Sequence, residues 1–159
     1  MSERTIAFAK ARSAPGARGL GTVFRRRFMA GDRATRAVLA DLVHELADAG
    51  VGEEDVSNLE LILAEVLNNV SEHAYAGTSG PVDLWVEALQ SGLLCQVSDQ
   101  GQPLPVDAVP DPALPLIAPP DHLPEGGFGW HIIRCLALDL DYARDGGWNR
   151  LRMRLPWVD

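Results

Sequence analysis

The sequence has few cysteines and no long apolar segment, and both shortages exclude classes of protein. Its two cysteines, Cys95 and Cys135, lie far apart, and no paired-cysteine spacing or histidine cluster completes a metal site. We expect both to be reduced, buried core residues. No apolar run approaches the roughly 18 to 20 residues of a membrane-spanning helix, and the charged N-terminus lacks the apolar region of a signal peptide. We therefore expect a cytoplasmic protein that does not bind membranes.

Positive charge is also scarce over most of the chain. The formal net charge is −8, yet residues 1–36 hold nine Lys or Arg against two acidic residues, which leaves −15 for residues 37–159. This acidic body argues against direct binding of nucleic acid by the folded part. The basic N-terminal part, which includes Arg25, Arg26 and Arg27, either meets an acidic partner or is only a solubilising charge run.

Length and composition predict one folded domain. A chain of 159 residues with 47% hydrophobic and 23% charged residues is long enough to bury a sizeable core. Residues 1–20 are rich in small residues, glycine and charge, so we expect them to form a flexible N-terminal tail. We expect residues 21–159 to form the single domain.

Residues 59–77 (LELILAEVLNNVSEHAYAG) carry a clear helical pattern. The apolar stripe at helical spacing consists of Leu59, Leu63, Val66 and Val70. Glu65 and Asn69 lie near its polar edge, four residues apart, so their side chains point to the same side one turn apart. A carboxylate and a neutral amide in this arrangement can serve one ligand, and the alternative is a solvated helix face. We expect the helix to begin at Ser57 or in the acidic cluster 53–55.

The remaining patterns predict strands and helices in a definite order. Strands are expected at 21–29, 82–89, 93–98, 139–143 and 148–155. Two further helices are expected at 32–49 and 129–138, and Asp32 is the expected N-cap of the first. This order predicts an α/β (α+β) two-layer sandwich, in which a mixed, mostly antiparallel sheet has its helices packed on one face.

The segment 102–125 holds eight of the eleven prolines, which excludes a regular helix or a central strand over most of its length. A long irregular loop in a compact domain is typical of a functional lid. The segment contains no Lys or Arg, and His122 is its one histidine. We therefore expect a mobile lid that offers no permanent positive charge to a ligand.

Three short motifs together predict a nucleotide site. In the helix, Asn69 offers a hard oxygen of the kind that Mg²⁺ prefers beside phosphates. Glu65, one turn away, can take a proton from an attacking hydroxyl. Further along, Gly126, Gly127 and Gly129 precede a helix whose free N–H groups can receive phosphate charge.

The third motif lies at the end of a predicted strand. Asp99 can accept a hydrogen bond from an exocyclic amine there, and Gly101 leaves room for a flat base. Taken singly, an Asp-x-Gly sequence is usually a turn, and a glycine-rich segment before a helix is usually a capping or packing feature. The order and spacing of all three motifs are more specific than any one of them.

This order and spacing resemble the GHKL-type ATPase superfamily and, within it, the small anti-sigma factor serine/threonine protein kinases of bacteria. The segments that carry the resemblance are 65–69 (EVLNN) with 73–75 (HAY), 99–103 (DQGQP) and 126–133 (GGFGWHII). The resemblance extends from Thr22 to Leu155. The strand that closes the site in this family usually begins with Gly-Thr, whereas here Gly147 is followed by Trp148 and Asn149.

The resemblance implies a Bergerat fold that binds ATP, in which Asn69 carries Mg²⁺, Glu65 is the base and Asp99 reads adenine. It also implies that the second glycine box, which consists of Gly126, Gly127 and Gly129 in segment 126–133, holds the phosphates. The implied substrate is a serine or threonine on an anti-anti-sigma partner, with a sigma factor as second partner and a homodimer allowed. Two rival hypotheses keep the fold: a non-catalytic module that binds ATP or only a protein, and the detached regulatory ATPase domain of a phosphatase system. Because the predicted lid has no Lys or Arg for the terminal phosphate, a kinase would need a cation from elsewhere, such as Arg134 or the partner protein.

Overall fold

The computed structural model of the protein describes residues 21–104 and 127–158. The predicted tail at 1–20 and nearly all of the predicted lid at 102–125 lie outside the described residues. In chain order the elements are β1 (Gly21–Met29), α1 (Asp32–Asp48), α2 (Glu53–Asn69), the π-helical turn η1 (Val70–Ala74), β2 (Pro81–Leu89), β3 (Gly92–Asp99), α3 (Gly127–Leu136), β4 (Leu138–Asp145) and β5 (Trp148–Pro156). None of the helices in these ranges is long and apolar enough to cross a bilayer.

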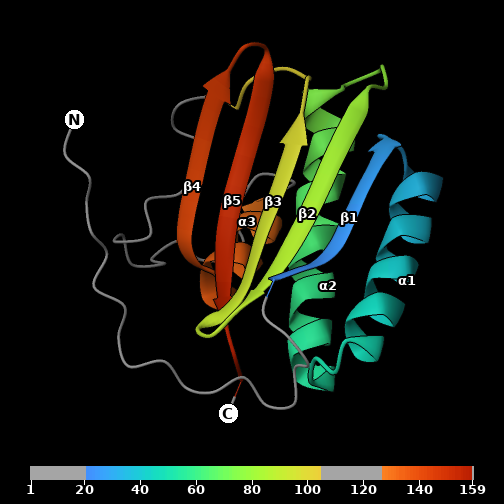
Figure 1. Ribbon diagram of the computed structural model, residues 1–159. Coiled ribbons are helices and arrows are strands. Elements are labelled where there is room, and N and C mark those ends of the chain that lie inside the picture. Colours follow the sequence, from blue (N-terminus) through green and yellow to red (C-terminus); the bar gives the residue numbers. More distant parts are fainter. Residues whose placement is uncertain (1–20, 105–126, 159) are drawn as a thin grey trace.

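One five-stranded sheet forms the first layer, in the order β1-β2-β3-β5-β4. Every neighbouring pair is antiparallel, including β3 and β5, which are separated along the chain by α3 and β4. The helices cover one face of the sheet, and Figure 1 shows the other face toward the viewer without a helix of the described chain on it. The predicted two-layer α+β class is confirmed, and the sheet is antiparallel at each described pairing rather than mixed.

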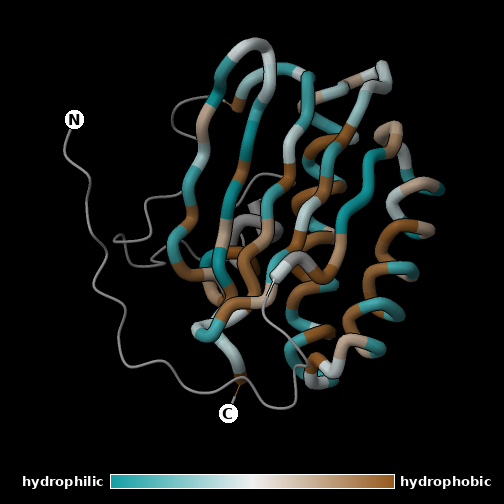
Figure 2. The backbone as a smooth tube through the Cα atoms, in the orientation of Figure 1, coloured by the Kyte–Doolittle hydropathy of each residue, from teal (hydrophilic) through white to brown (hydrophobic). Residues whose placement is uncertain are grey.

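Alternation along the strands places apolar side chains under the helices. On β5, for example, Leu151 and Met153 are buried, whereas Arg152 between them is exposed. Figure 2 shows the resulting alternation of hydrophilic and hydrophobic residues along the strands. The predicted helical stripe is buried as well, and consists of Leu59, Leu63, Val66 and Val70. Because each such side chain contributes roughly 1.5–3 kcal/mol when buried, this core holds α2 firmly against the sheet.

The two long helices begin after glycines and not after side-chain caps. The N-cap of α1 is Gly31 and Asp32 is its first residue, so the predicted Asp32 cap is wrong. The Asp32 carboxylate still lies in the first turn, where negative charge favours the helix dipole. The N-cap of α2 is Gly52, and the helix begins at Glu53. The acidic cluster therefore starts this helix, and Ser57 does not.

The two cysteines have different environments. Cys95 on β3 is fully buried, and this burial raises the pKa of its thiol to about 12. Cys135 on α3 is exposed, so the prediction that both cysteines are core residues is wrong for this one. The fully buried side chain of α3 is Ile133, two positions earlier. Residues two positions apart on an α-helix lie on nearly opposite sides, which explains the exposure of Cys135.

Candidate functional site

The turn after β3 packs against η1, at the end of α2. The Gln102 N–H donates to the Ala74 carbonyl oxygen at 2.7 Å and thereby joins the turn to η1. A Cβ atom on Gly101 would lie 2.4 Å from the same oxygen, so any larger residue would displace the main chain of η1. The structure thus gives Gly101 a packing role that does not depend on a ligand.

Tyr75 makes a second link between these segments. Its hydroxyl donates to the Pro81 carbonyl oxygen and accepts the Gln100 N–H, each at 2.7 Å. Burial raises the pKa of the Tyr75 hydroxyl above its ordinary value, the Gln100 N–H lowers it in part, and the Asp99 carboxylate raises it again. A Cβ on Gly80, the residue before β2, would lie 2.4 Å from the Tyr75 ring, so the ring leaves no room for a side chain at position 80.

A cavity lies beside this turn, between the helices and the sheet. Its empty volume is about 450 Å³, including space open to solvent. The helix wall, formed by α2 and η1, consists of Val66, Asn69, Val70 and Ala74. The strand wall, formed by β3, β4 and β5, consists of Val97, Asp99, Tyr142, Asn149 and Leu151. Asn69 and Asp99, two of the predicted site residues, therefore line one cavity from different walls.

Asp99 is a buried carboxylate with one occupied oxygen. The residue is 6% exposed. Its Oδ1 accepts the Gly101 N–H at 2.8 Å and the Asn149 Nδ2–H at 2.9 Å. Within the described ranges, no group donates to Oδ2. A buried carboxylate oxygen without a donor is unfavourable, so a ligand that donates a hydrogen bond to Oδ2 would be stabilised there.

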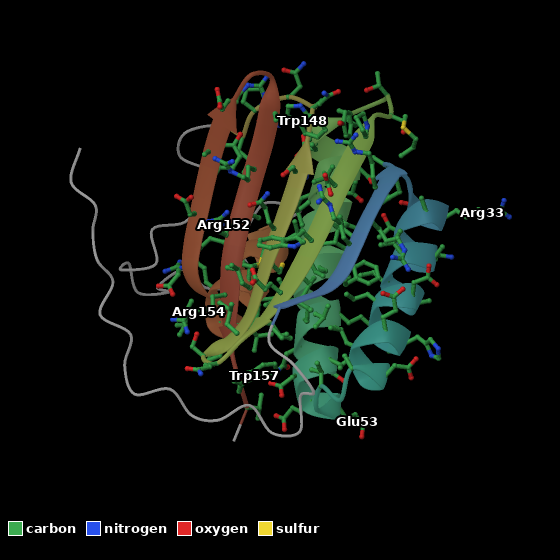
Figure 3. All side chains as sticks on the ribbon, in the orientation of Figure 1. Arg33, Glu53, Trp148, Arg152, Arg154 and Trp157 are labelled. Carbon is green, nitrogen blue, oxygen red and sulfur yellow. The ribbon has the colours of Figure 1, made fainter. Side chains whose placement is uncertain are left out.

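Asn149 is a site residue that the sequence did not single out. It is 4% exposed, lines the cavity and is the cross-strand neighbour of Asp99. The signal in the sequence was the departure from Gly-Thr after Gly147, but only the strand register shows that Asn149 meets Asp99. Trp148, the preceding residue, lies on the helix-free face at one end of the sheet (Figure 3), where the Arg27 guanidinium is 5.5 Å from its ring centre.

On the helix wall, Asn69 has an unpaired polar atom. Its Nδ2 is buried and has no hydrogen-bond partner in the part of the chain that the structure describes. An unpaired buried N–H costs roughly 1–3 kcal/mol, so a ligand that accepts from it gains this amount. Glu65 lies one turn earlier on α2, is partly exposed and does not line the cavity. The structure therefore brings Asn69 to the cavity and keeps Glu65 on the same helix beside it.

The second glycine box lies at the start of α3. This helix begins at Gly127, earlier than predicted, so Gly127 and Gly129 belong to its first turn and do not precede it. Gly126 lies outside the described residues. Since α3 packs against α2, the glycine box and Asn69 belong to neighbouring helices.

The side chains present fit a magnesium nucleotide better than a metal ion alone. Among the described residues, no group of three or more His, Cys, Asp or Glu could hold a metal. Asn69 can supply one oxygen, and Mg²⁺ commonly takes one or two protein ligands together with phosphates and waters. The unpaired amide of Asn69 can donate to an oxygen of such a ligand, and Oδ2 of Asp99 can accept a hydrogen bond from it.

The helix-free face of the sheet has a different character. Arg154 pairs with Asp139 at 2.7 Å, and Arg152 donates to the Gln96 side chain at 3.0 Å. Figure 3 shows Arg152 and Arg154 on this face, away from the helices. These charged and polar groups satisfy one another, and they lie across the sheet from the cavity.

Sequence comparison identifies a family and several relatives of this chain. Residues 28–155 match the histidine kinase-like ATPase domain. The chain is similar to the serine-protein kinases RsbW of Bacillus cereus (strain AH820) and Bacillus thuringiensis (strain Al Hakam), at 25% identity over 100 residues in each case. RsbW of Bacillus cereus (strain B4264) is 24% identical over the same length. Each of these matches spans 62% of this chain and 62% of the relative.

Proposed function

The chain belongs to the histidine kinase-like ATPase domain family, and from this membership we propose that it binds Mg-ATP between the helix wall and the strand wall. The observation that carries the proposal is that Asn69 Nδ2 on the helix wall is buried without a partner in the described chain, while the hydrogen bonds that Asp99 on the strand wall accepts from described residues go to Oδ1 and leave Oδ2 for a ligand. Adenine offers an exocyclic amine to Asp99, and the rest of the nucleotide offers oxygens to Asn69. The apolar lining, which includes Val66, Val97 and Leu151, suits the faces of a flat base.

The other predicted residues take roles that agree with this placement. Asn69 would hold Mg²⁺ through its side-chain oxygen, and the ion would supply positive charge that neutralises the phosphates. Gly126, Gly127 and Gly129 allow the main chain to approach the phosphates at the start of α3. Glu65, one turn from Asn69, takes the proton from the attacking hydroxyl group.

We infer that the hydroxyl belongs to a partner protein. The relatives are named serine-protein kinases, and the motifs resemble those of anti-sigma factor kinases. On this basis the chain is an anti-sigma regulatory factor that phosphorylates a serine or threonine on an anti-anti-sigma partner and binds a sigma factor.

A non-catalytic module that binds ATP or a protein is the second candidate function. The observation that favours it is that no described Lys or Arg lines the cavity, while phosphoryl transfer usually needs a cation at the terminal phosphate. Arg144 donates instead to the Gly101 carbonyl oxygen and to Asn149. Arg134 lies in the last turn of α3, at the far end from the glycine box. A kinase of this structure would take its cation from the partner protein.

Two measurements test the proposal. Thermal unfolding with increasing Mg-ATP should show stabilisation, by about 2.7 kcal/mol at a hundredfold excess over the dissociation constant. Radiolabelled ATP with Mg²⁺ should then transfer label to an anti-anti-sigma protein, and chelation of Mg²⁺ should stop the transfer. No stabilisation by ATP would contradict nucleotide binding. Stabilisation without transfer to any partner would favour the non-catalytic module.

A further inference from the structure

The side chain of Asn149 has one allowed orientation. Tyr142 Oη donates to its Oδ1 at 2.8 Å, and Arg144 Nη1 donates to the same atom at 2.6 Å. Arginine can only donate, and the Tyr142 hydroxyl already accepts the Leu104 N–H at 3.0 Å, so its proton is directed to Asn149. The atom that receives both bonds must be the carbonyl oxygen, which places the amide nitrogen on the side of Asp99.

The amide nitrogen of Asn149 is also fully used. Nδ2 donates to Asp99 Oδ1 at 2.9 Å, to the Gln102 carbonyl oxygen at 3.0 Å and to the Gly101 carbonyl oxygen at 3.2 Å. Its two hydrogens therefore face three acceptors, and both lone pairs of Oδ1 are taken as well. Asn149 lines the cavity but has no hydrogen-bonding capacity left for a ligand.

The same contacts fix the carboxylate of Asp99. Its Oδ1 is held by the Gly101 N–H and by Asn149, so rotation of the carboxylate would break one partly buried and one buried hydrogen bond. Oδ2 is then the atom that Asp99 offers to a ligand, and a carboxylate oxygen can only accept. A ligand amine at this position gains a hydrogen bond, whereas a keto oxygen meets a negative charge.

We propose that Asn149 is a positioning residue that sets the preference of the cavity for a 6-amino purine over a 6-keto purine. It acts through Asp99 and does not touch the base, while Arg144 and Tyr142 fix its own orientation. The inference rests on the proposed function, because it concerns the base of the same nucleotide. An asparagine without such partners could present either a donor or an acceptor to a base.

The test compares ATP with ITP, its 6-keto counterpart, by calorimetric titration in the presence of Mg²⁺. The proteins are the wild type, Asn149→Val and Arg144→Met. Valine suits a strand and has no polar hydrogen to donate to Asp99, and Arg144 is an exposed position. The wild type should bind ATP about 10- to 100-fold more tightly than ITP, as expected for one hydrogen bond to a charged group. The ratio should fall to about threefold or less in Asn149→Val and take an intermediate value in Arg144→Met.

Arg152→Ala is the matched control, since Arg152 lies on β5 on the opposite face and donates to Gln96. It should keep the wild-type ratio. A merely structural role would lower the melting temperature of Asn149→Val and both affinities together, and an unchanged ratio overturns the proposal. If Asn149→Val does not fold, an unchanged ratio in Arg144→Met overturns it equally.

The wild type separates this inference from the proposed function. Equal binding of ATP and ITP overturns the role of Asn149 and leaves ATP binding intact. Binding of neither nucleotide overturns the proposed function and this inference together.

Discussion

The strand wall and the helix wall of the cavity differ in how fully their polar atoms are paired. On the strand wall, Asn149 makes five hydrogen bonds, and one oxygen of Asp99 accepts two. On the helix wall, Asn69 Nδ2 is buried without a partner in the described chain. A hydrogen-bonded network such as that around Asn149 holds one geometry before a ligand arrives, whereas an unpaired group such as Asn69 Nδ2 gains its bond only on binding.

Under the proposed function, this difference suggests that the two walls have different roles. The strand wall is organised in advance and selects the base. The helix wall carries the groups that act on phosphate and metal, and its polar atoms depend on the ligand for partners. Variants of the strand wall should therefore change selectivity, and those that remove hydrogen bonds of the Asn149 network should also lower the stability of the free protein. Variants of the helix wall and of Glu65 beside it should change turnover and ligand-dependent stability.

The largest expected effect concerns chemistry at Glu65, one turn before the helix-wall residue Asn69 on α2. Glu65→Gln keeps the size of the side chain but removes the proton acceptor, so transfer of labelled phosphate to the partner should fall by roughly 10²- to 10⁴-fold while Mg-ATP still binds. Glu60→Gln, at an exposed position of α2, is the matched control and should transfer normally. Undiminished transfer by Glu65→Gln would exclude Glu65 as the base.

The next effect concerns base recognition at the strand wall. Asp99→Asn keeps an oxygen for the Gly101 and Asn149 donors but turns an N–H toward the ligand amine. ATP affinity, measured by titration, should fall about 10- to 100-fold, since a charged hydrogen bond is lost. The melting temperature of the free protein should change little. Asp83→Asn, on the helix-free face, is the control and should bind ATP as the wild type does. Unchanged affinity in Asp99→Asn would place the base elsewhere.

Local patterns predicted most of the fold. The strands follow from alternation within a few residues, as on β5, and the helical stripe of α2 follows from spacing within one element. Asn69 and Asp99 could be selected because their chemistry is readable from a short motif. Each of these signals lies within one stretch of sequence, where spacing alone fixes which side chains share a face.

The missed features depend on contacts between distant segments. Asn149 meets Asp99 only through the register of β3 with β5, and the partner of Gly101 is the main chain of Ala74. The N-caps were missed because glycines precede both helices and leave no side-chain signal. The exposure of Cys135 follows from the side of α3 that packs inward, which composition does not reveal.

A third prediction compares the two walls by stability without nucleotide. Asn149→Ala should lower the free energy of unfolding by about 1–3 kcal/mol, because the buried Asp99 carboxylate loses a donor. Asn69→Ala should leave it unchanged or raise it, because the variant removes an unpaired buried amide. Urea unfolding measures both. With Mg-ATP present, Asn69→Ala should lose the magnesium-dependent part of the stabilisation. Equal destabilisation by both variants would contradict the difference between the walls.

The smallest expected effect concerns Tyr75, which joins η1 to the turn after β3. Its neutral hydroxyl makes two hydrogen bonds, and Tyr75→Phe leaves the Gln100 N–H without its acceptor. The variant should lose about 1 kcal/mol of unfolding free energy at neutral pH, as is typical for one net hydrogen bond. Urea unfolding at a series of pH values, compared with the wild type, measures this loss.

The same comparison should depend on pH in a definite direction. Burial raises the folded-state pKa of Tyr75 above the ordinary 10.0, so above that pH the unfolded chain loses a proton that the folded chain retains. The stabilisation by the hydroxyl is fully present below the unfolded pKa and is lost as pH rises through the folded pKa. Wild-type stability should therefore approach that of Tyr75→Phe in this range. Cys95, with its pKa raised to about 12, titrates in both proteins and cancels in the difference. A difference that stays constant with pH would show that Tyr75 is not held neutral by the fold.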